Sequence, residues 1–269
     1  MVISIHGMQS NCLKKREDIL GRNFTNSGIA YFAFNNRGHE LRAYIKKIDG
    51  DSRPEGGSSY EDVLEGYYDV KGAINRMLEL GYSKIHLQGH SLGCTKIIYT
   101  YDKLKRENNT RLLESIKDIM LLSLVDIVGI QKESLREEKY NEALKYAEEK
   151  EEQDKILDLM PRECFSHPIS VKSYLRYFRD NERIDFARFG DKNYDFKELN
   201  NIEIPLFLRW GTVSEIVSQD LDELVEFLKS KIHNERLDIG YIKGADHSYF
   251  EKEDTLITEM MFFIKYIAD

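Results

Sequence analysis

The sequence has no long hydrophobic run and few cysteines. No apolar segment approaches the roughly 18 residues of a membrane span, and no basic segment followed by a long apolar one marks a signal peptide. We therefore expect no membrane span and a cytoplasmic location. The three cysteines, Cys12, Cys94 and Cys164, are odd in number and lack metal-ligand spacing. This favours free thiols that pack as small hydrophobic residues in a reducing compartment.

The chain also lacks a stripe of basic residues. Its formal net charge is -8, whereas contacts to phosphates need lysine and arginine clustered on one face. Nucleic-acid binding is therefore disfavoured. Internal repeats and low-complexity linkers are absent as well, and 41% hydrophobic with 32% charged residues is typical of a globular protein. The length of 269 residues allows one large domain or two small ones.

Residues 84–94 carry the most specific signal in the sequence. An alternating apolar run that starts at Ile85 predicts a strand, and it ends in Gly89-His90-Ser91-Leu92-Gly93. A helix-compatible run from Thr95 to Leu104 follows directly. Between a strand and a helix, the two glycines permit a turn too tight for other side chains, which puts Ser91 in a strained, exposed position at its apex. This context favours a nucleophilic serine.

Strands and helices alternate on both sides of this stretch. Ser58 and Glu61 have the spacing of a capping box at the start of the helix that Gly81 ends. The alternation predicts an α/β fold with a mainly parallel, doubly wound sheet. The further strands are expected at 2–5, 29–34, 116–125, 204–210 and 237–242, and the further helices at 13–20, at 220–232 and at the end of the chain.

The alternation breaks between residues 129 and 200. This segment is charged and helical, with an aromatic-rich second half that includes Tyr174, Tyr177 and Phe178. We interpret it as a helical insertion into a core formed by residues 1–128 and 201–269. The aromatic residues fit two interpretations equally well, a small core of the insertion itself or the wall of a pocket.

Every unusual polar motif comes directly after a predicted strand. The carboxyl ends of parallel strands meet at one edge of a sheet, so these motifs are expected to form one site. They are His6-Gly7, Asn36-Arg37-Gly38-His39, Ser91, Asp126, Glu215 and His247.

In this order the motifs, with the Trp210-Gly211 loop and the Gly244-Ala245-Asp246-His247 loop, resemble the α/β-hydrolase family over nearly the whole chain. The resemblance implies an esterase- or lipase-like serine hydrolase in which residues 129–200 form a lid. Ser91 would be the nucleophile and His247 the general base. The chain starts at what would be the family's third strand, so we expect the first two strands to be missing. An exposed sheet edge would remain, suited to homodimerisation.

The residue that orients His247 is less clear. The family commonly has Asp three residues after the glycine of the Trp-Gly loop, where this chain has Ser214. We favour the next residue, Glu215, as the acid of the triad. Asp126 is the second choice, because some family members present the acid after the strand that follows the serine turn. Asp246 is adjacent to His247 and is expected to form a loop hydrogen bond instead.

The remaining site residues follow from the same resemblance. The backbone N–H groups of Met8 and Leu92 would form the oxyanion hole. His86 alternates with apolar strand residues and is expected in the core, and His39 is expected to brace the site. The candidate substrate-binding residues are His6, Gly7, His90, Tyr174, Tyr177 and Phe178.

These residues predict cleavage of a small-molecule carboxylic ester, including a lactone or thioester, through an acyl-enzyme intermediate. No metal or cofactor is implied. Two alternatives stay open: an acyltransferase or cyclising thioesterase with the same triad, and a non-catalytic ligand-binding protein of the same fold.

Overall fold

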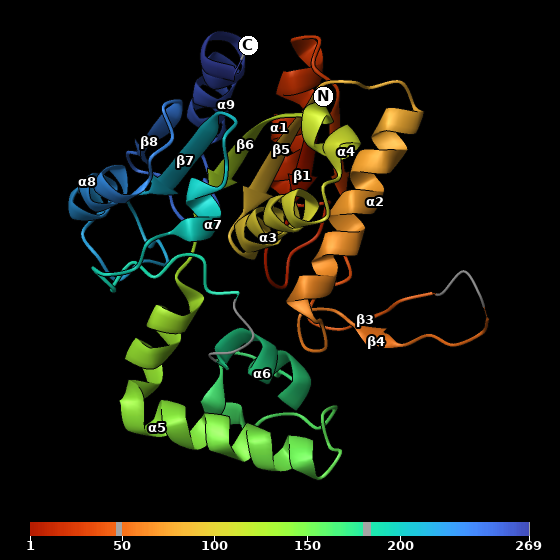
Figure 1. Ribbon diagram of the computed structural model, residues 1–269, viewed down its shortest axis with the longest axis vertical. Helices are drawn as coiled ribbons and strands as arrows, with labels where there is room; N and C mark the ends of the chain where they lie inside the picture. The colour runs from red at the N-terminus through yellow and green to blue at the C-terminus, as the bar shows by residue number, and fades with distance from the viewer. Residues whose placement is uncertain (47–49, 180–183, 269) are drawn as a thin grey trace.

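Six parallel strands form the main sheet of the computed structural model, which describes residues 1–46, 50–179 and 184–268 (Figure 1). Their order in the sheet is β2-β1-β5-β6-β7-β8, so β2 and β8 are its edge strands. This confirms the predicted α/β fold with a parallel sheet. The strands are β1 (Val2–Ile5), β2 (Tyr31–Phe34), β5 (Ile85–His90), β6 (Ile116–Leu122), β7 (Leu206–Gly211) and β8 (Leu237–Ile242).

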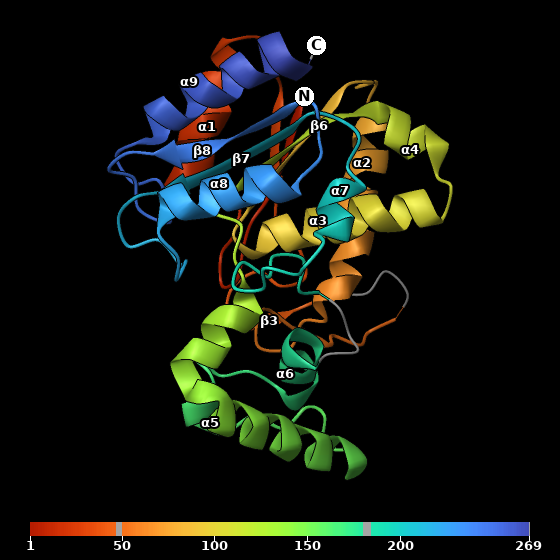
Figure 2. The same ribbon diagram turned by 60° about the vertical axis from the view of Figure 1, so that its left-hand side comes forward.

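Helices cover both faces of the sheet because its central strands are apolar on both faces. Successive side chains of a strand point to opposite sides. Ile119 and Leu121 therefore pack with one set of helices, and Met120 and Leu122 pack with the other. The two sets of helices lie on opposite faces of the sheet (Figure 2). The first set is α2 (Gly66–Glu79), α3 (Leu92–Arg106) and α8 (Leu221–Lys231), and the second is α1 (Lys15–Asn26) and α9 (Glu253–Phe263).

Two regions differ from the sequence-based prediction. The predicted capping box of Ser58 and Glu61 is wrong: the helical segment begins after Asp62, whose side chain accepts a hydrogen bond from Leu64 N. Glu61 is not available as a cap because its carboxylate is paired with Lys96. Short elements that we did not predict also occur. They are the antiparallel pair β3 (Ala43–Tyr44) and β4 (Glu55–Gly56), the 3-10 turn η1 (Val63–Glu65), and α4 (Thr110–Ser115) and α7 (Lys197–Asn200). The helix expected at the end of the chain consists of α9 followed by η3 (Ile264–Ala268).

A separate helical layer lies beyond the carboxyl end of the sheet (Figure 1). It consists of α5 (Ile127–Glu152), the 3-10 turn η2 (Arg162–Cys164) and α6 (Val171–Phe178), and we call it the α5–α6 layer, residues 127–178. The layer has its own core of buried side chains. Phe186 and Phe196, by contrast, pack in the main core. The segment 129–200 thus does not pack as one unit: its first part forms the core of the α5–α6 layer, and its last part joins the main core.

Several residues expected inside the protein lie in or near its core. His86 is buried, and its Nδ1 atom forms a hydrogen bond with Asp118 Oδ2 at 2.5 Å. All three cysteines are free thiols, and Cys94 and Cys164 are buried. Among the helices of the described residues, none is both long enough and apolar enough to cross a bilayer.

The first turn of α3 lies directly against the end of β1. A Cβ atom on Gly93 would be 2.1 Å from the carbonyl oxygen of Ile5, well inside van der Waals contact. Because both atoms belong to packed backbone, neither can move away cheaply. Glycine at this position therefore permits α3 to start where it does.

Gly93→Ala is expected to lower the free energy of unfolding by about 2–4 kcal/mol, because the added methyl group overlaps the backbone of β1. The matched control is Gly72→Ala in the middle of α2, where an added Cβ has nothing within 4 Å. That substitution should raise stability by about 0.5–1 kcal/mol through helix propensity. Urea denaturation of both variants measures the difference, and equal effects would contradict this account of the packing.

Candidate active site

Ser91 occupies the sharp turn between β5 and α3. Its backbone has φ 54° and ψ −125°, a conformation that L-residues rarely adopt. The turn is fixed by backbone hydrogen bonds, from Ser91 N to Leu122 O at 2.8 Å and from Cys94 N to Ser91 O at 2.9 Å. The strained geometry predicted for this serine is therefore present, and the residue lines a cavity at the carboxyl edge of the sheet.

His247 and Glu215 lie side by side on the loops that follow β8 and β7. The Nδ1 atom of His247 forms a hydrogen bond with Glu215 Oε1. The Glu215 side chain is 4% exposed and that of His247 is 18% exposed, so the pair is shielded from water on the carboxylate side. His247 also lines the cavity that Ser91 lines. The fold thus brings three of the predicted site residues to one place.

Glu215 is held as a carboxylate by several donors. Burial raises the pKa of Glu215. The hydrogen bond and charge of His247, together with donors such as Gly211 N and the Ser123 hydroxyl, lower it by more than burial raises it, so the pKa is below the ordinary value. Gly211 N and Ser123 Oγ donate to Oε2 at 2.9 and 2.7 Å, and Ile216 N donates to Oε1 at 2.9 Å. The carboxylate therefore places a negative charge beside the His247 ring.

Ser123 was not predicted as a site residue. It follows β6 with φ 52°, and its hydroxyl lies 3.0 Å from the Tyr249 hydroxyl, which donates to Arg209 O at 2.7 Å. It was missed because apolar Leu124 and Val125 follow it and extend the apparent strand past it. The signal that could have identified Ser123 is that it is the first polar residue after the apolar run of β6.

Asp126 has different partners. Its carboxylate caps α5 by accepting a hydrogen bond from Gly129 N at 2.6 Å, and it also accepts one from Phe189 N at 3.0 Å. Burial raises its pKa. Of the two candidates for the acid of the triad, Glu215 contacts His247, and Asp126 joins α5 to the segment around residue 189. Asp246 accepts bonds from Ser248 N and Phe250 N within its own loop.

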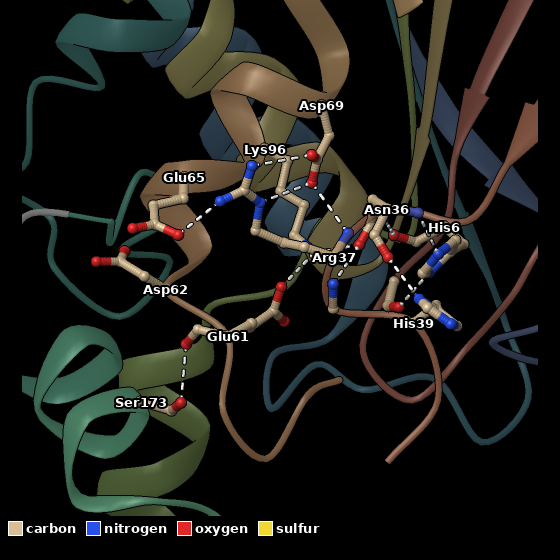
Figure 3. Close-up of polar contacts among 12 residues, drawn as sticks. His6, Asn36, Arg37, His39, Glu61, Asp62, Glu65, Asp69, Lys96 and Ser173 are labelled. Carbon is tan, nitrogen blue, oxygen red and sulfur yellow. Dashed lines mark hydrogen bonds and ion pairs between the residues drawn. The ribbon is translucent and has the colours of Figure 1, made fainter. Parts of the chain in front are cut away.

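Three other histidines contact backbone carbonyls around the site. His90 is buried, and its Nε2 lies 2.7 Å from His247 O, so the ring donates to the loop that carries His247. His6 is 2% exposed, accepts a hydrogen bond from Asn36 N on Nε2 at 3.2 Å, and contacts Gly7 O through Nδ1 at 2.9 Å (Figure 3). Nδ1 must therefore carry the proton of the neutral ring. Nδ1 of His39 lies 2.9 Å from Asn36 O.

The predicted oxyanion donors flank Ser91. A Cβ atom on Gly7 would be 2.8 Å from Ser91 Cβ, so the loop that carries Met8 lies directly on the serine turn. Leu92 is the first residue of α3, where backbone N–H groups have no partner within the helix. Both residues line the cavity. An anion placed between them would also face the positive end of the helix dipole.

The cavity has a volume of about 640 Å³, which is the size of a small-molecule site. Gly7 and His90 line it, whereas His6 does not. Tyr174, Tyr177 and Phe178 are buried in the core of the α5–α6 layer and are not among the lining residues. From that layer, the cavity is lined by Ile130, Leu135, Cys164, Phe165 and His167, among others. No group of three or more His, Cys, Asp and Glu side chains in the described ranges is arranged to hold a metal ion.

Comparisons with known proteins agree with this architecture. Neither a protein-family model nor a curated protein matches the sequence significantly. Among solved structures, Est1E from Butyrivibrio proteoclasticus with bound ferulic acid has 15% identity and a TM-score of 0.65, over 100% of this chain and 89% of that chain. A soluble variant of Saccharomyces cerevisiae monoglyceride lipase with a substrate analog has 13% identity and a TM-score of 0.63, over 100% and 86%.

A monoacylglycerol lipase from Paleococcus ferrophilus has 20% identity and a TM-score of 0.54, over 96% of this chain and 93% of that chain. Similarity at such low identity shows the fold. The chain therefore has the α/β-hydrolase fold along its whole length. This confirms, for the fold, the resemblance that the sequence motifs indicated.

His6 should make folding stability depend on acidity. Burial, and secondly the charge of Lys96, lower its pKa from 6.5 to about 4. Between these values the unfolded chain binds more protons than the folded one, so stability decreases as pH falls below about 6.5 and this contribution levels off below about 4. The loss from His6 is up to about 3 kcal/mol. Urea denaturation at pH 7 and pH 4.5 measures it.

The matched variant is His6→Asn, which keeps a donor near Gly7 O but cannot titrate in this range. Its stability should differ less between pH 7 and pH 4.5 than that of the wild type. A difference of the same size in both proteins would show that His6 does not contribute.

Proposed function

We propose that this chain is a serine hydrolase that cleaves a carboxylic ester through an acyl-enzyme intermediate. The observation that carries the proposal is the combination of a strained Ser91 and a His247–Glu215 hydrogen bond at one cavity. A serine hydroxyl is a poor nucleophile until an imidazole accepts its proton. The similarity in fold to esterases and lipases supports the same reaction class.

In the proposed reaction, Ser91 Oγ attacks the ester carbonyl carbon while its proton moves to Nε2 of His247. The carbonyl oxygen becomes an oxyanion, which accepts hydrogen bonds from Met8 N–H and Leu92 N–H. His247 then gives its proton to the departing alcohol, and the acyl group stays on Ser91. Water repeats the sequence: it loses a proton to His247, attacks the acyl carbon and releases the acid, and Ser91 regains its proton.

Glu215 has two functions in this scheme. Its hydrogen bond to Nδ1 keeps the His247 ring in the tautomer whose Nε2 can accept a proton, and its charge stabilises the imidazolium that forms. Ser123, Gly211 N and Ile216 N hold the carboxylate in place. Glu215 can thus stand where the family commonly has Asp, because it comes one position later in the loop and has a longer side chain.

The cavity supports a small ester with an apolar part. Leu92 and Val125 contribute apolar wall from the core, and Ile130, Leu135 and Phe165 contribute it from the α5–α6 layer. We infer that this layer acts as the lid that sets specificity. The side chains that would do so are these apolar residues, and not Tyr174, Tyr177 and Phe178, which the sequence had favoured.

A fluorophosphonate probe should label the wild-type protein, because an activated serine attacks phosphorus as it attacks a carbonyl. Labelling should be lost in Ser91→Ala, with mass spectrometry locating the adduct on Ser91. Circular dichroism checks that the variant is folded. A folded wild-type protein that is neither labelled nor able to hydrolyse p-nitrophenyl acetate would refute the hydrolase and favour a ligand-binding protein.

Replacing the carboxylate beside His247 should be far more damaging than replacing the one that caps α5. Glu215→Gln is expected to lower kcat/KM for p-nitrophenyl acetate by about 10³- to 10⁴-fold, because the ring loses its orienting charge. Asp126→Asn is the matched control: asparagine can also cap a helix, so the change should stay within about threefold. The opposite ranking of these two variants would make Asp126 the acid.

A further inference from the structure

A lysine is buried in the protein core directly behind the site. Lys96 is in the second turn of α3, and its side chain is 0% exposed, as is that of Glu61 (Figure 3). The Lys96 ammonium donates to Glu61 Oε2 at 2.7 Å and to Asn36 Oδ1 at 2.9 Å. A buried ion pair usually stabilises a fold no better than apolar side chains of similar volume. Stability alone therefore does not account for a buried charged pair, and its location behind the site points to a second role.

The backbone around the pair leaves room for it. A Cβ atom on Gly38 would be only 1.9 Å from Glu61 Oε2. The Glu61 carboxylate therefore occupies the space that a side chain at position 38 would take. This arrangement fixes the carboxylate between the loop that follows β2 and helix α3.

On one side, the pair is connected to the oxyanion loop. Asn36 accepts from Lys96 on Oδ1 and donates through Nδ2 to His6 O at 3.3 Å, and its backbone N–H donates to His6 Nε2 (Figure 3). His6 in turn donates from Nδ1 to Gly7 O. That carbonyl belongs to the same planar peptide unit as Met8 N–H, so holding the carbonyl fixes the direction of the N–H bond.

On the other side, the pair is connected to the α5–α6 layer. The second carboxylate oxygen of Glu61, Oε1, accepts from the Tyr177 hydroxyl at 2.9 Å. The Glu61 backbone carbonyl accepts from Ser173 Oγ at 2.8 Å (Figure 3). Both donors are in α6. One carboxylate therefore contacts the layer through one oxygen and Lys96 through the other.

We propose that Glu61 and Lys96 are positioning residues that couple the seating of helix α6 to the geometry of the oxyanion loop. This inference rests on the proposed function where it concerns catalysis. With α6 seated, Tyr177 holds Glu61, Glu61 holds Lys96, and Asn36 and His6 transmit the restraint to the Gly7–Met8 peptide. When α6 is displaced, the Met8 N–H loses its fixed direction. Substrate that is not enclosed by the layer would then react slowly.

The main test uses the double variant Glu61→Gln/Lys96→Met, which removes both charges at nearly constant volume and so leaves the core without an unpaired ion. For p-nitrophenyl acetate we expect kcat to fall about 10- to 100-fold, as for partial loss of an oxyanion donor, with KM within about threefold. Amide hydrogen exchange of residues 6–10 and of α6 should accelerate together.

Tyr177→Phe is a milder variant that removes only the bond from α6 to the Glu61 carboxylate and keeps the one from Ser173 to the Glu61 carbonyl. It should accelerate exchange at residues 6–10, although the lost hydroxyl belongs to a different element, and lower kcat several-fold. The matched control is Arg209→Met, which removes another buried cation, paired with Asp238 and Glu259 at 2.7 and 2.5 Å away from the α5–α6 layer. It should leave exchange in both segments unchanged.

The outcomes separate the two proposals. If Tyr177→Phe, or a folded double variant, leaves both kcat and exchange at residues 6–10 at the wild-type level, the coupling is refuted. If the wild type neither reacts with the fluorophosphonate nor turns over an ester, the hydrolase proposal fails. Hydrogen exchange then still decides whether α6 and the oxyanion loop are coupled.

Discussion

The close approach of helix α3 to the end of strand β1 is the constraint on which the rest of the site depends. The carbonyl of Ile5 fills the space next to Gly93, so the helix begins immediately beside the sheet. This places the N-terminus of α3 against the loop that carries Met8, with Ser91 between them. The positions of these side chains thus depend on a backbone contact. Any side chain at position 93 would push α3 away from β1.

Burial keeps two of the histidines around this contact neutral. Removal from water lowers the pKa of His6 and of His90, so both are neutral near pH 7 and can orient backbone carbonyls without adding charge. His247 instead faces the Glu215 carboxylate and the cavity. The ring of His247 is thus next to a carboxylate, whereas the rings of His6 and His90 are buried and hold the backbone.

The α5–α6 layer contributes to the cavity, but not through the aromatic residues of α6 that the sequence analysis singled out. Tyr174 and Phe178 lie one turn apart on α6 and pack in the core of the layer. Tyr177 uses its hydroxyl to contact Glu61. The apolar wall of the cavity comes from less conspicuous residues, such as Ile130 and Phe165. Of the two interpretations that the sequence allowed, the observed packing matches the small core.

The sequence by itself determined the parallel α/β sheet, the strained turn at Ser91 and the loops that meet at the sheet edge. These features follow from local patterns, namely apolar alternation, helical periodicity and glycines at a tight turn. Only the tertiary structure decided that Glu215 contacts His247, that Ser123 supports the carboxylate, and that Glu61 pairs with Lys96 instead of capping a helix. Those contacts join residues far apart in the chain, and local patterns hold no information on which distant partner a charged side chain meets.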